Sequence, residues 1–247
     1  NLCNKLIEEV HNRDMKIVFD LVMNHTSDQH AWFKESSSSK DNPKADWYVW
    51  KDGRGKNGMK APNNWKATIG GSGWHYSKER HQFYWASFLN FQPDLNYHNP
   101  EVRAEMLETA KFWLAKGVDG FRLDIFNSIY EDTSFVNNPS SLRIIPSEEN
   151  PDGFFQKMKY NVNQDGSFAF ATELRAVVDS FTNPTRFLVG EVFGDVETTK
   201  KFCSYKGKDG LHTIFLFQTL STPFEAKKWK KMVEEFEQNF PAPYIPT

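Results

Sequence analysis

Cysteine, long apolar runs and net charge are all scarce in this chain of 247 residues. It has two cysteines, Cys3 and Cys203, so a framework of disulfide bonds is not expected. No apolar stretch approaches the roughly 20 residues of a membrane-spanning helix. The 30 basic and 32 acidic side chains leave a net charge of −2 and are mixed along the sequence. Nucleic acid and membranes are therefore not expected as partners.

The sequence also lacks a clear beginning and end. Residues 2–10 already read as an amphipathic helix, with Leu2, Leu6 and Val10 on one face, but nothing before them supplies the strand that such a helix would follow. Residues 240–247 form a proline-rich loop that leads to no further element. No signal peptide is visible. We expect a middle section of a longer enzyme, located in the cytoplasm.

Three short runs each join an apolar strand to an acid at or near its C-terminal end: Lys16-Ile-Val-Phe-Asp20, Gly120-Phe-Arg-Leu-Asp124 and Arg186-Phe-Leu-Val-Gly-Glu191. Continuous apolar runs are typical of strands buried on both faces of a parallel sheet. In a closed α/β barrel, a single domain of about 250 residues, catalytic groups lie at the C-terminal ends of the strands. Carboxylates that meet there indicate acid/base or nucleophilic chemistry, of the kind that cleaves glycosidic bonds.

The order of elements is expected to be helix, strand, long insert, helix, strand, helix, strand, strand. Strands are predicted at 17–23, 120–126, 187–192 and 213–217, and helical regions at 154–162 and 174–181. The helix after the insert should begin with Asn99 as its N-cap and Pro100 at its first position, and end at Gly117. The insert, roughly residues 25–99, is polar and aromatic, and so long a stretch inside a barrel is usually functional.

Two acids are expected to have opposite environments. Arg122 and Asp124 are two apart on one strand, so they point to the same face, and the cation would keep Asp124 ionised as a nucleophile. Glu191 ends a strand in an apolar context, where desolvation raises the pKa of a carboxylic acid and suits it to donate a proton. The alternative is a structural Asp–Arg pair with an edge-exposed glutamate. Finding both patterns on consecutive strands favours catalysis.

His25 lies just past the end of the strand that contains Asp20. A histidine at a strand end is often a structural hydrogen-bonding group, but residues 24–28 are all polar, which fits a wet cleft. There His25 could donate a hydrogen bond to a sugar hydroxyl.

The motifs resemble those of one known family. Four segments carry the resemblance: Asp20-Leu-Val-Met-Asn-His25-Thr-Ser-Asp-Gln-His30, Gln92-Pro-Asp-Leu-Asn96, Gly120-Phe-Arg-Leu-Asp124 and Gly190-Glu191. They look like signature regions of the α-amylase superfamily, glycoside hydrolase family 13. The glutamine-containing segment is similar to the oligo-1,6-glucosidase and α-glucosidase subgroup. Three insert segments match domain B of that subgroup: Trp47-Tyr-Val-Trp50, Pro62-Asn-Asn-Trp65 and Gly70-Gly-Ser-Gly-Trp74.

The resemblance implies a role for each candidate residue. Asp124 would be the nucleophile and Glu191 the general acid/base, with Arg122 beside the nucleophile. Asp20 and His25 would contact the sugar whose bond is cleaved. The family retains anomeric configuration, and its two catalytic carboxyl groups are expected ~5–5.5 Å apart. No metal and no cofactor is assigned.

The resemblance also implies an architecture. The fold class is α/β, a partial TIM (β/α)8 barrel with domain B inserted between the third strand and third helix. Residues 1–25 and 100–247 would belong to the barrel and 26–99 to domain B. The first two and last two barrel strands would be absent, together with the third catalytic acid and the subgroup's usual calcium-binding loop, so this chain alone should be inactive.

The expected activity is exo-hydrolysis of terminal α-linked glucose from oligosaccharides or disaccharides by a monomeric parent enzyme. Ile125 is bulky and follows the nucleophile, which favours α-1,6 over α-1,4 linkages in this subgroup. Ile69 stands where the subgroup usually has an aromatic residue, which leaves the pocket shape open. A sucrose isomerase or transglycosylase of the same family, or a non-catalytic transporter subunit, are the alternatives. An aldolase-type barrel would need a lysine at a strand end, and none of these strands ends in one.

Overall fold

The structure is a computed structural model, and it describes residues 2–145, 152–215, 217, 219 and 222–240. The described chain divides into two compact units. Unit 1 comprises Asn1–Leu21, Glu105–Phe126 and Phe168–Thr247, and unit 2 comprises Val22–Ala104 and Asn127–Ser167. Each unit is therefore built from segments that are distant in the sequence.

Unit 1 contains a parallel sheet of four strands in the order β1-β5-β6-β9. Its strands are β1 (Val18–Leu21), β5 (Gly120–Leu123), β6 (Phe187–Gly190) and β9 (Thr213–Ile214). Asp20 pairs in register with Arg122, and Leu123 pairs with Gly190. Because the strands are parallel, their C-terminal ends meet at one edge of the sheet. This is the α/β arrangement that the apolar runs predict.

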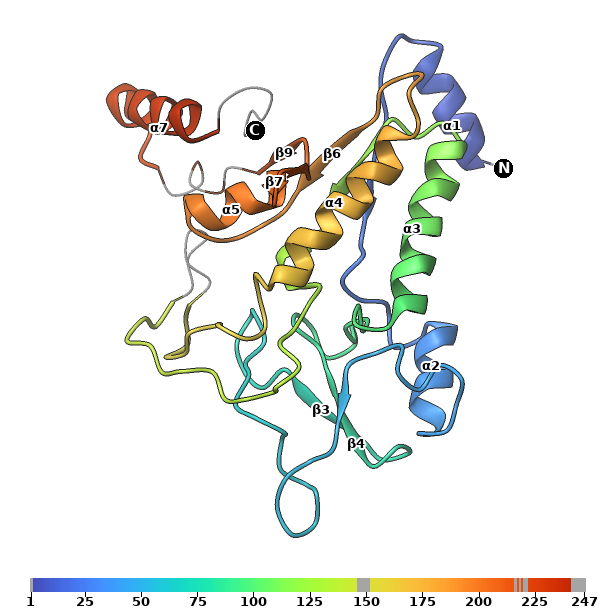
Figure 1. The fold of residues 1–247 in the computed structure, drawn as a ribbon, viewed down its shortest axis with the longest axis vertical. Helices are drawn as coiled ribbons and strands as arrows, with labels where there is room; N and C mark the ends of the chain where they lie inside the picture. Colours follow the sequence, from blue (N-terminus) through green and yellow to red (C-terminus); the bar gives the residue numbers. More distant parts are fainter. Residues whose placement is uncertain (1, 146–151, 216, 218, 220–221, 241–247) are drawn as a thin grey trace. The chain divides into compact units, whose positions relative to one another are not determined.

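Helices accompany this sheet in the chain: α1 (Leu2–His11), α3 (Pro100–Ala115), α4 (Asp165–Asp179), α5 (Val196–Cys203) and α7 (Ala226–Asn239), with the strand pair β7 (Ser204–Tyr205) and β8 (Lys208–Asp209) following α5. Figure 1 shows α4 alongside β6. Phe168 of α4 packs edge-on against Phe202 of α5, and both are buried. Large apolar side chains of the strands, Phe121 and Leu188 among them, are also buried. The core of unit 1 thus lies between helices and sheet.

The beginning and end of α3 agree with the sequence prediction. The side-chain Oδ1 of Asn99 accepts a hydrogen bond from the backbone N–H of Glu101 at 2.9 Å. After the helix, Gly117 has a φ of +99°, a left-handed conformation that glycine adopts without a steric penalty. The helix therefore ends where β5 must begin.

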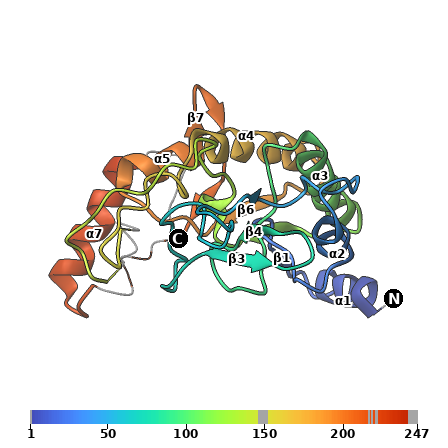
Figure 2. The same ribbon diagram turned by 90° about the horizontal axis from the view of Figure 1, so that it is seen from below.

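Unit 2 contains a small antiparallel sheet in the order β2-β4-β3, and Figure 2 shows β3 and β4 side by side. Its elements are α2 (Ala31–Ser38), β2 (Trp50–Lys51), β3 (Trp74–Ser77) and β4 (Gln82–Trp85), and the 3-10 turn η1 (Phe126–Ser128) leads into its second segment. The aromatic core contains Trp65, Trp74 and Trp85. At Gly73 an added Cβ would lie 2.2 Å from the Trp85 ring, so only glycine fits there.

One predicted helix is wrong. Residues 154–162 form no helix, because their backbone groups bond to a neighbouring loop instead: Phe155 donates to the carbonyl of Arg143 and Lys157 to that of Pro139. Phe154 and Phe155 also have positive φ values of +53° and +62°, which break a helix. The helix predicted at 174–181 is found as α4. The predicted strands are present but shorter, and the predicted loop at 240–247 lies almost entirely outside the described residues.

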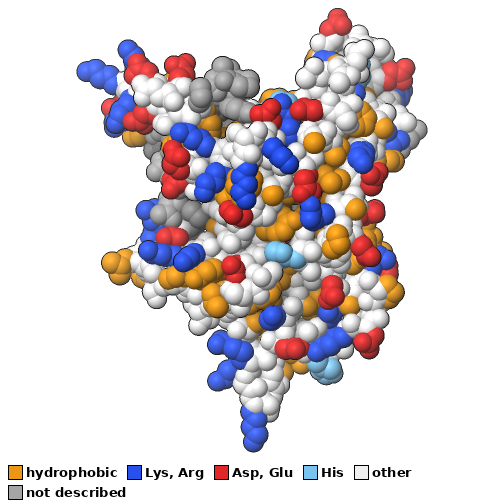
Figure 3. Space-filling model, in the orientation of Figure 1, with side chains coloured by type: hydrophobic (Ala, Val, Ile, Leu, Met, Phe, Trp, Pro, Cys, Tyr) orange, Lys and Arg blue, Asp and Glu red, His pale blue; other side chains and the backbone are white. Residues whose placement is uncertain are grey.

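The visible surface is mixed in charge. Figure 3 shows basic and acidic side chains interspersed over the face in view, with no field of a single sign. Within the described ranges, no helix is both long and apolar enough to cross a lipid bilayer.

Candidate active site

Arg122 lies at the centre of a group of three carboxylates in unit 1. Its Nη1 donates to Asp20 Oδ1 at 2.9 Å and also to Asp124, while Nη2 donates to Glu191. The three acids come from β1, from the end of β5 and from the end of β6. The register of the parallel sheet places them together, because Asp20 and Arg122 are paired neighbours and Glu191 follows β6 directly.

Backbone bonds hold the two acids that follow β5 and β6. The N–H of Glu191 donates to the carbonyl of Leu123 at 2.8 Å, and the N–H of Phe126 donates to the carbonyl of Glu191 at 2.9 Å. These bonds continue the pairing of β5 and β6 beyond the strand ends. Both carboxylates are therefore carried on well-anchored backbone.

The acids differ in exposure. The side chain of Asp20 is 58% exposed, that of Asp124 25% and that of Glu191 16%. Burial raises the pKa of Glu191, the Arg122 guanidinium opposes this, and a hydrogen bond with Asp124 raises the pKa further. The net result is a pKa above the usual glutamate range. A carboxyl group that keeps its proton to higher pH is suited to general acid catalysis.

Arg122 itself is held in its charged form. Burial lowers the pKa of the guanidinium, but hydrogen bonds to Asp20 and Asp124 and the charge of Glu191 more than compensate, so the net pKa is raised. A permanent cation among three acids limits their mutual repulsion.

Ile125, which follows Asp124, has an unusual backbone. Its φ is +34°, in the left-handed region that β-branched residues rarely adopt. Its N–H points to Glu191 Oε2 at 3.4 Å. Strain of this kind costs about 1–3 kcal/mol and is concentrated at functional sites.

His25 belongs to unit 2, where it is buried and forms an isolated antiparallel bridge with Asp94. Its ring nitrogens contact the side-chain amides of Asn24 and Gln92. The structure thus brings together four of the five predicted residues, with Asp20, Asp124 and Glu191 around Arg122, and describes His25 within its own unit.

The sequence reading missed a second pair of acids. Asp94 and Glu131 of unit 2 are almost fully buried, and Asp94 Oδ2 and Glu131 Oε1 have no hydrogen-bond partner among the described residues. Burial raises the pKa of Asp94 to about 7, and burial together with the charge of Asp94 raises the pKa of Glu131 well above the glutamate range. The signal that could have found Glu131 is its place directly after the apolar run Ile129-Tyr130.

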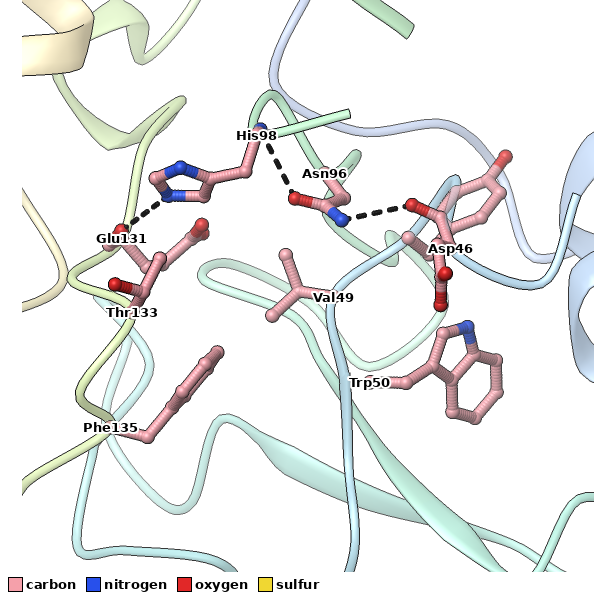
Figure 4. A pocket seen from close by; sticks show the side chains of 9 residues that line it. Asp46, Val49, Trp50, Asn96, His98, Glu131, Thr133 and Phe135 are labelled. Carbon is pink, nitrogen blue, oxygen red and sulfur yellow. Dashed lines mark hydrogen bonds between the residues drawn. The ribbon is translucent and has the colours of Figure 1, made fainter. Parts of the chain in front are cut away.

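A pocket of about 160 Å³ also lies in unit 2, with Glu131 in its lining (Figure 4). The His98 ring contacts the backbone carbonyl of Glu131, and the His98 backbone N–H donates to Asn96 Oδ1. His98 therefore joins two sides of the pocket. The pocket is lined by three aromatic residues, Tyr48, Trp50 and Phe135. Tyr48 is buried and packs edge-on against Phe33. Trp50 stacks on Phe33 and lies under the Arg80 guanidinium, and Phe135 stacks on Trp65 and lies under the Lys51 ammonium. None of these rings therefore offers an open face for stacking on a sugar.

The described residues contain no group of three or more His, Cys, Asp or Glu side chains arranged to hold a metal ion.

Sequence comparisons point to one family. The family profile described as "Alpha amylase, catalytic domain" matches residues 1–241. A probable α-glucosidase of Rhizobium meliloti is 40% identical over 227 residues, which cover 87% of this chain and 39% of that protein. An oligo-1,6-glucosidase of Heyndrickxia coagulans is 41% identical over 237 residues, which cover 92% of this chain and 39% of that protein. This chain therefore spans less than half the length of these relatives.

Solved structures agree. An α-glucosyl transfer enzyme matches with a TM-score of 0.86 and 36% identity, over 96% of this chain and 44% of that one. An isomaltulose synthase mutant of Erwinia rhapontici, solved with D-glucose, matches with a TM-score of 0.79 and 28% identity, over 98% of this chain and 43% of that one.

Proposed function

The chain belongs to the α-amylase catalytic-domain family, and from this premise we propose that it carries part of the active site of a retaining, exo-acting α-glucosidase. The observation that supports this proposal most directly is the contact of one guanidinium with the carboxylates of Asp20, Asp124 and Glu191 at the ends of parallel strands. The relatives described above include α-glucosidases and oligo-1,6-glucosidases.

The proposed reaction has two steps. Asp124 attacks the anomeric carbon of the terminal glucose, while Glu191 gives its proton to the departing glycosidic oxygen. A glucosyl ester on Asp124 results. Glu191, now ionised, takes a proton from water, and the resulting hydroxide attacks the anomeric carbon and releases Asp124. The raised pKa of Glu191 favours the protonated form that a proton donor needs, and Arg122, Asp20 and His25 bind the sugar and orient the acids.

Substitution of the two acids tests the mechanism in the full-length enzyme. Asp124→Asn and Glu191→Gln should each abolish turnover of an unactivated α-glucoside. A substrate with a good leaving group should partly rescue Glu191→Gln, because its departure needs no protonation. Retention of more than about a tenth of the activity by Asp124→Asn would exclude it as the nucleophile.

We propose α-1,6-linked glucose as the preferred substrate, with α-1,4 as the alternative. Ile125 is bulky and β-branched, and its position after Asp124 would narrow the space for the second sugar. Initial rates on isomaltose and maltose decide between the linkages, and a much higher maltose rate would reject this preference without affecting the mechanism.

An isomerase or transglycosylase is the second candidate, because the solved structures of an α-glucosyl transfer enzyme and of an isomaltulose synthase match this chain well. Sucrose distinguishes the classes: hydrolysis yields glucose and fructose, whereas an isomerase yields a new disaccharide.

We further propose a barrel whose remaining strands lie outside this chain, with domain B over residues 26–99. The isolated chain should then show no turnover. The cytoplasmic location and the monomeric state stay predictions.

A further inference from the structure

His25 has a side-chain amide at each ring nitrogen. Asn24 Nδ2 lies 3.2 Å from Nδ1, and Gln92 Nε2 lies 2.8 Å from Nε2. Two NH2 groups cannot both donate to a neutral imidazole, because the ring has one acceptor nitrogen and one N–H. One of the amides must therefore present its oxygen, and the surrounding hydrogen bonds determine which.

The neighbours of Asn24 fix its orientation. Its Nδ2 lies 3.0 Å from Ser87 Oγ. The Ser87 backbone N–H donates to Asp94 Oδ1 at 3.0 Å, and the Ser87 hydroxyl also lies beside this carboxyl, to which its hydrogen can point. Ser87 Oγ is then left as an acceptor for the nitrogen of Asn24. His25 Nδ1 is then the acceptor nitrogen, and the ring hydrogen is on Nε2.

Gln92 must consequently turn its oxygen to the ring. As placed, Gln92 Oε1 is buried and has no partner among the described residues. Rotating the amide by half a turn brings this oxygen to His25 Nε2 at the observed 2.8 Å. We propose that Gln92 is a positioning residue, whose side-chain carbonyl accepts the Nε2–H of His25 and holds the ring as the Nε2–H tautomer.

The backbone keeps the two side chains together. Thr26 N–H donates to the carbonyl of Pro93, and Leu95 N–H donates to that of Asn24, so the two segments run as an antiparallel pair on both sides of the contact. Pro93 also restricts Gln92 to an extended conformation. The Gln92 amide therefore approaches His25 from anchored backbone rather than from a free loop.

The functional consequence depends on the proposed role of His25 as a sugar contact. A hydroxyl oxygen that reaches Nε2 finds a hydrogen already there, and it can share or replace the carbonyl of Gln92. In the other tautomer the hydrogen would be on Nδ1, facing Asn24, and the sugar would gain no donor.

Nitrogen-15 NMR of histidine-labelled full-length protein tests the inference, with the His25 signals assigned by a His25→Gln variant. The unchanged protein should show the hydrogen on Nε2. Gln92→Met, which removes the acceptor at similar size, should give a mixture of tautomers, whereas Gln92→Glu, which restores an acceptor oxygen, should keep the hydrogen on Nε2. Gln29→Met, at an exposed position of the same unit, is the control and should change nothing.

Hydrogen on Nδ1 in the unchanged protein, or an unaltered tautomer in Gln92→Met, overturns the proposal. Kinetics separate it from the proposed function. If His25 contacts the sugar, Gln92→Met should raise KM about tenfold with a smaller change in kcat. Tautomer changes without any change in KM would support the role of Gln92 and reject His25 as a sugar contact.

Discussion

Each unit of this chain contains a group of acids, and the two groups are organised in opposite ways. In unit 1, three carboxylates share the guanidinium of Arg122 and stay partly exposed. In unit 2, Asp94 and Glu131 are almost fully buried, burial is the largest cause of the raised pKa of both, and neither forms an ion pair with another described residue. Burial raises the pKa of Glu191 in the first group and of both acids in the second, and the charge of Arg122 opposes this increase at Glu191.

The difference shows two ways in which a protein carries acids away from water. Beside Arg122, charge can remain on more than one acid at once, as the proposed reaction at the anomeric carbon would require. The buried pair has no such compensation, so protons are retained instead. The first arrangement would suit the proposed reaction, whereas the burial of the second pair makes the free energy of unfolding depend on pH.

Removal of the cation should have the largest effect. Arg122→Leu leaves three acids without their shared partner and should lower kcat/KM of the full-length enzyme by about 1,000-fold or more. Arg122→Lys keeps the charge but cannot contact three carboxylates with a planar fork, and should lose about 100-fold. Arg13→Leu, at an exposed ion pair of the same unit, is the control. A loss below tenfold in Arg122→Leu would remove the distinction between the two groups.

Neutralising the buried pair should have an intermediate effect, on stability. An acid whose pKa is raised by folding keeps a proton that the unfolded chain releases, so the folded state loses stability as pH rises above the ordinary pKa near 4. This loss amounts to about 1.4 kcal/mol per pH unit and continues up to the raised pKa. Glu131→Gln should therefore gain stability relative to the unchanged protein by about 3 kcal/mol between pH 5 and pH 7, as measured by urea unfolding.

Asp94→Asn provides the matched variant. The charge of Asp94 contributes to the raised pKa of Glu131, so the pKa of Glu131 should fall in Asp94→Asn, as carbon-13 NMR of the carboxyl group can measure. A relative stability of Glu131→Gln that does not change with pH would mean that the pair is not protonated in the folded state.

An exposed ion pair should give the smallest effect and supplies the baseline. Glu9 and Arg13 are four residues apart, 2.6 Å from each other and roughly half exposed. Glu9→Gln should change the free energy of unfolding by only about 0.3 kcal/mol, and less at high salt. A loss above 1 kcal/mol would show that exposure is a poor guide to the value of ion pairs in this chain.

The sequence predicted the parts of the fold that depend on local pattern. Apolar runs located β1, β5 and β6, and Asn99 and Gly117 marked the ends of α3. The helix predicted at 154–162 was wrong because a helical pattern cannot reveal that the backbone groups of these residues bond to the loop at 139–144. The predicted strands were longer than the observed ones, because the apolar residues continue past the last residue that pairs in the sheet.

The candidate site was predictable only where its residues follow strands. Asp20, Arg122, Asp124 and Glu191 come together because parallel strands bring their C-terminal ends to one edge. The contact of Gln92 with His25 and the burial of Glu131 were not predicted because they depend on contacts distant in the sequence: Gln92 meets a residue 67 positions away, and Glu131 interacts with Asp94. Catalytic roles stay predictions until the variants are measured.

The left-handed backbone of Ile125 has a consequence for protein engineering. Glycine at this position would adopt the same φ of +34° with less strain, but it would also remove a buried side chain. Losing a buried isoleucine costs about 2–5 kcal/mol, more than the roughly 1–3 kcal/mol of strain that glycine would relieve. Selection for heat resistance should therefore retain a bulky side chain here, and the strained backbone between Asp124 and the bond that Phe126 donates to Glu191 is kept as the cost of burying it.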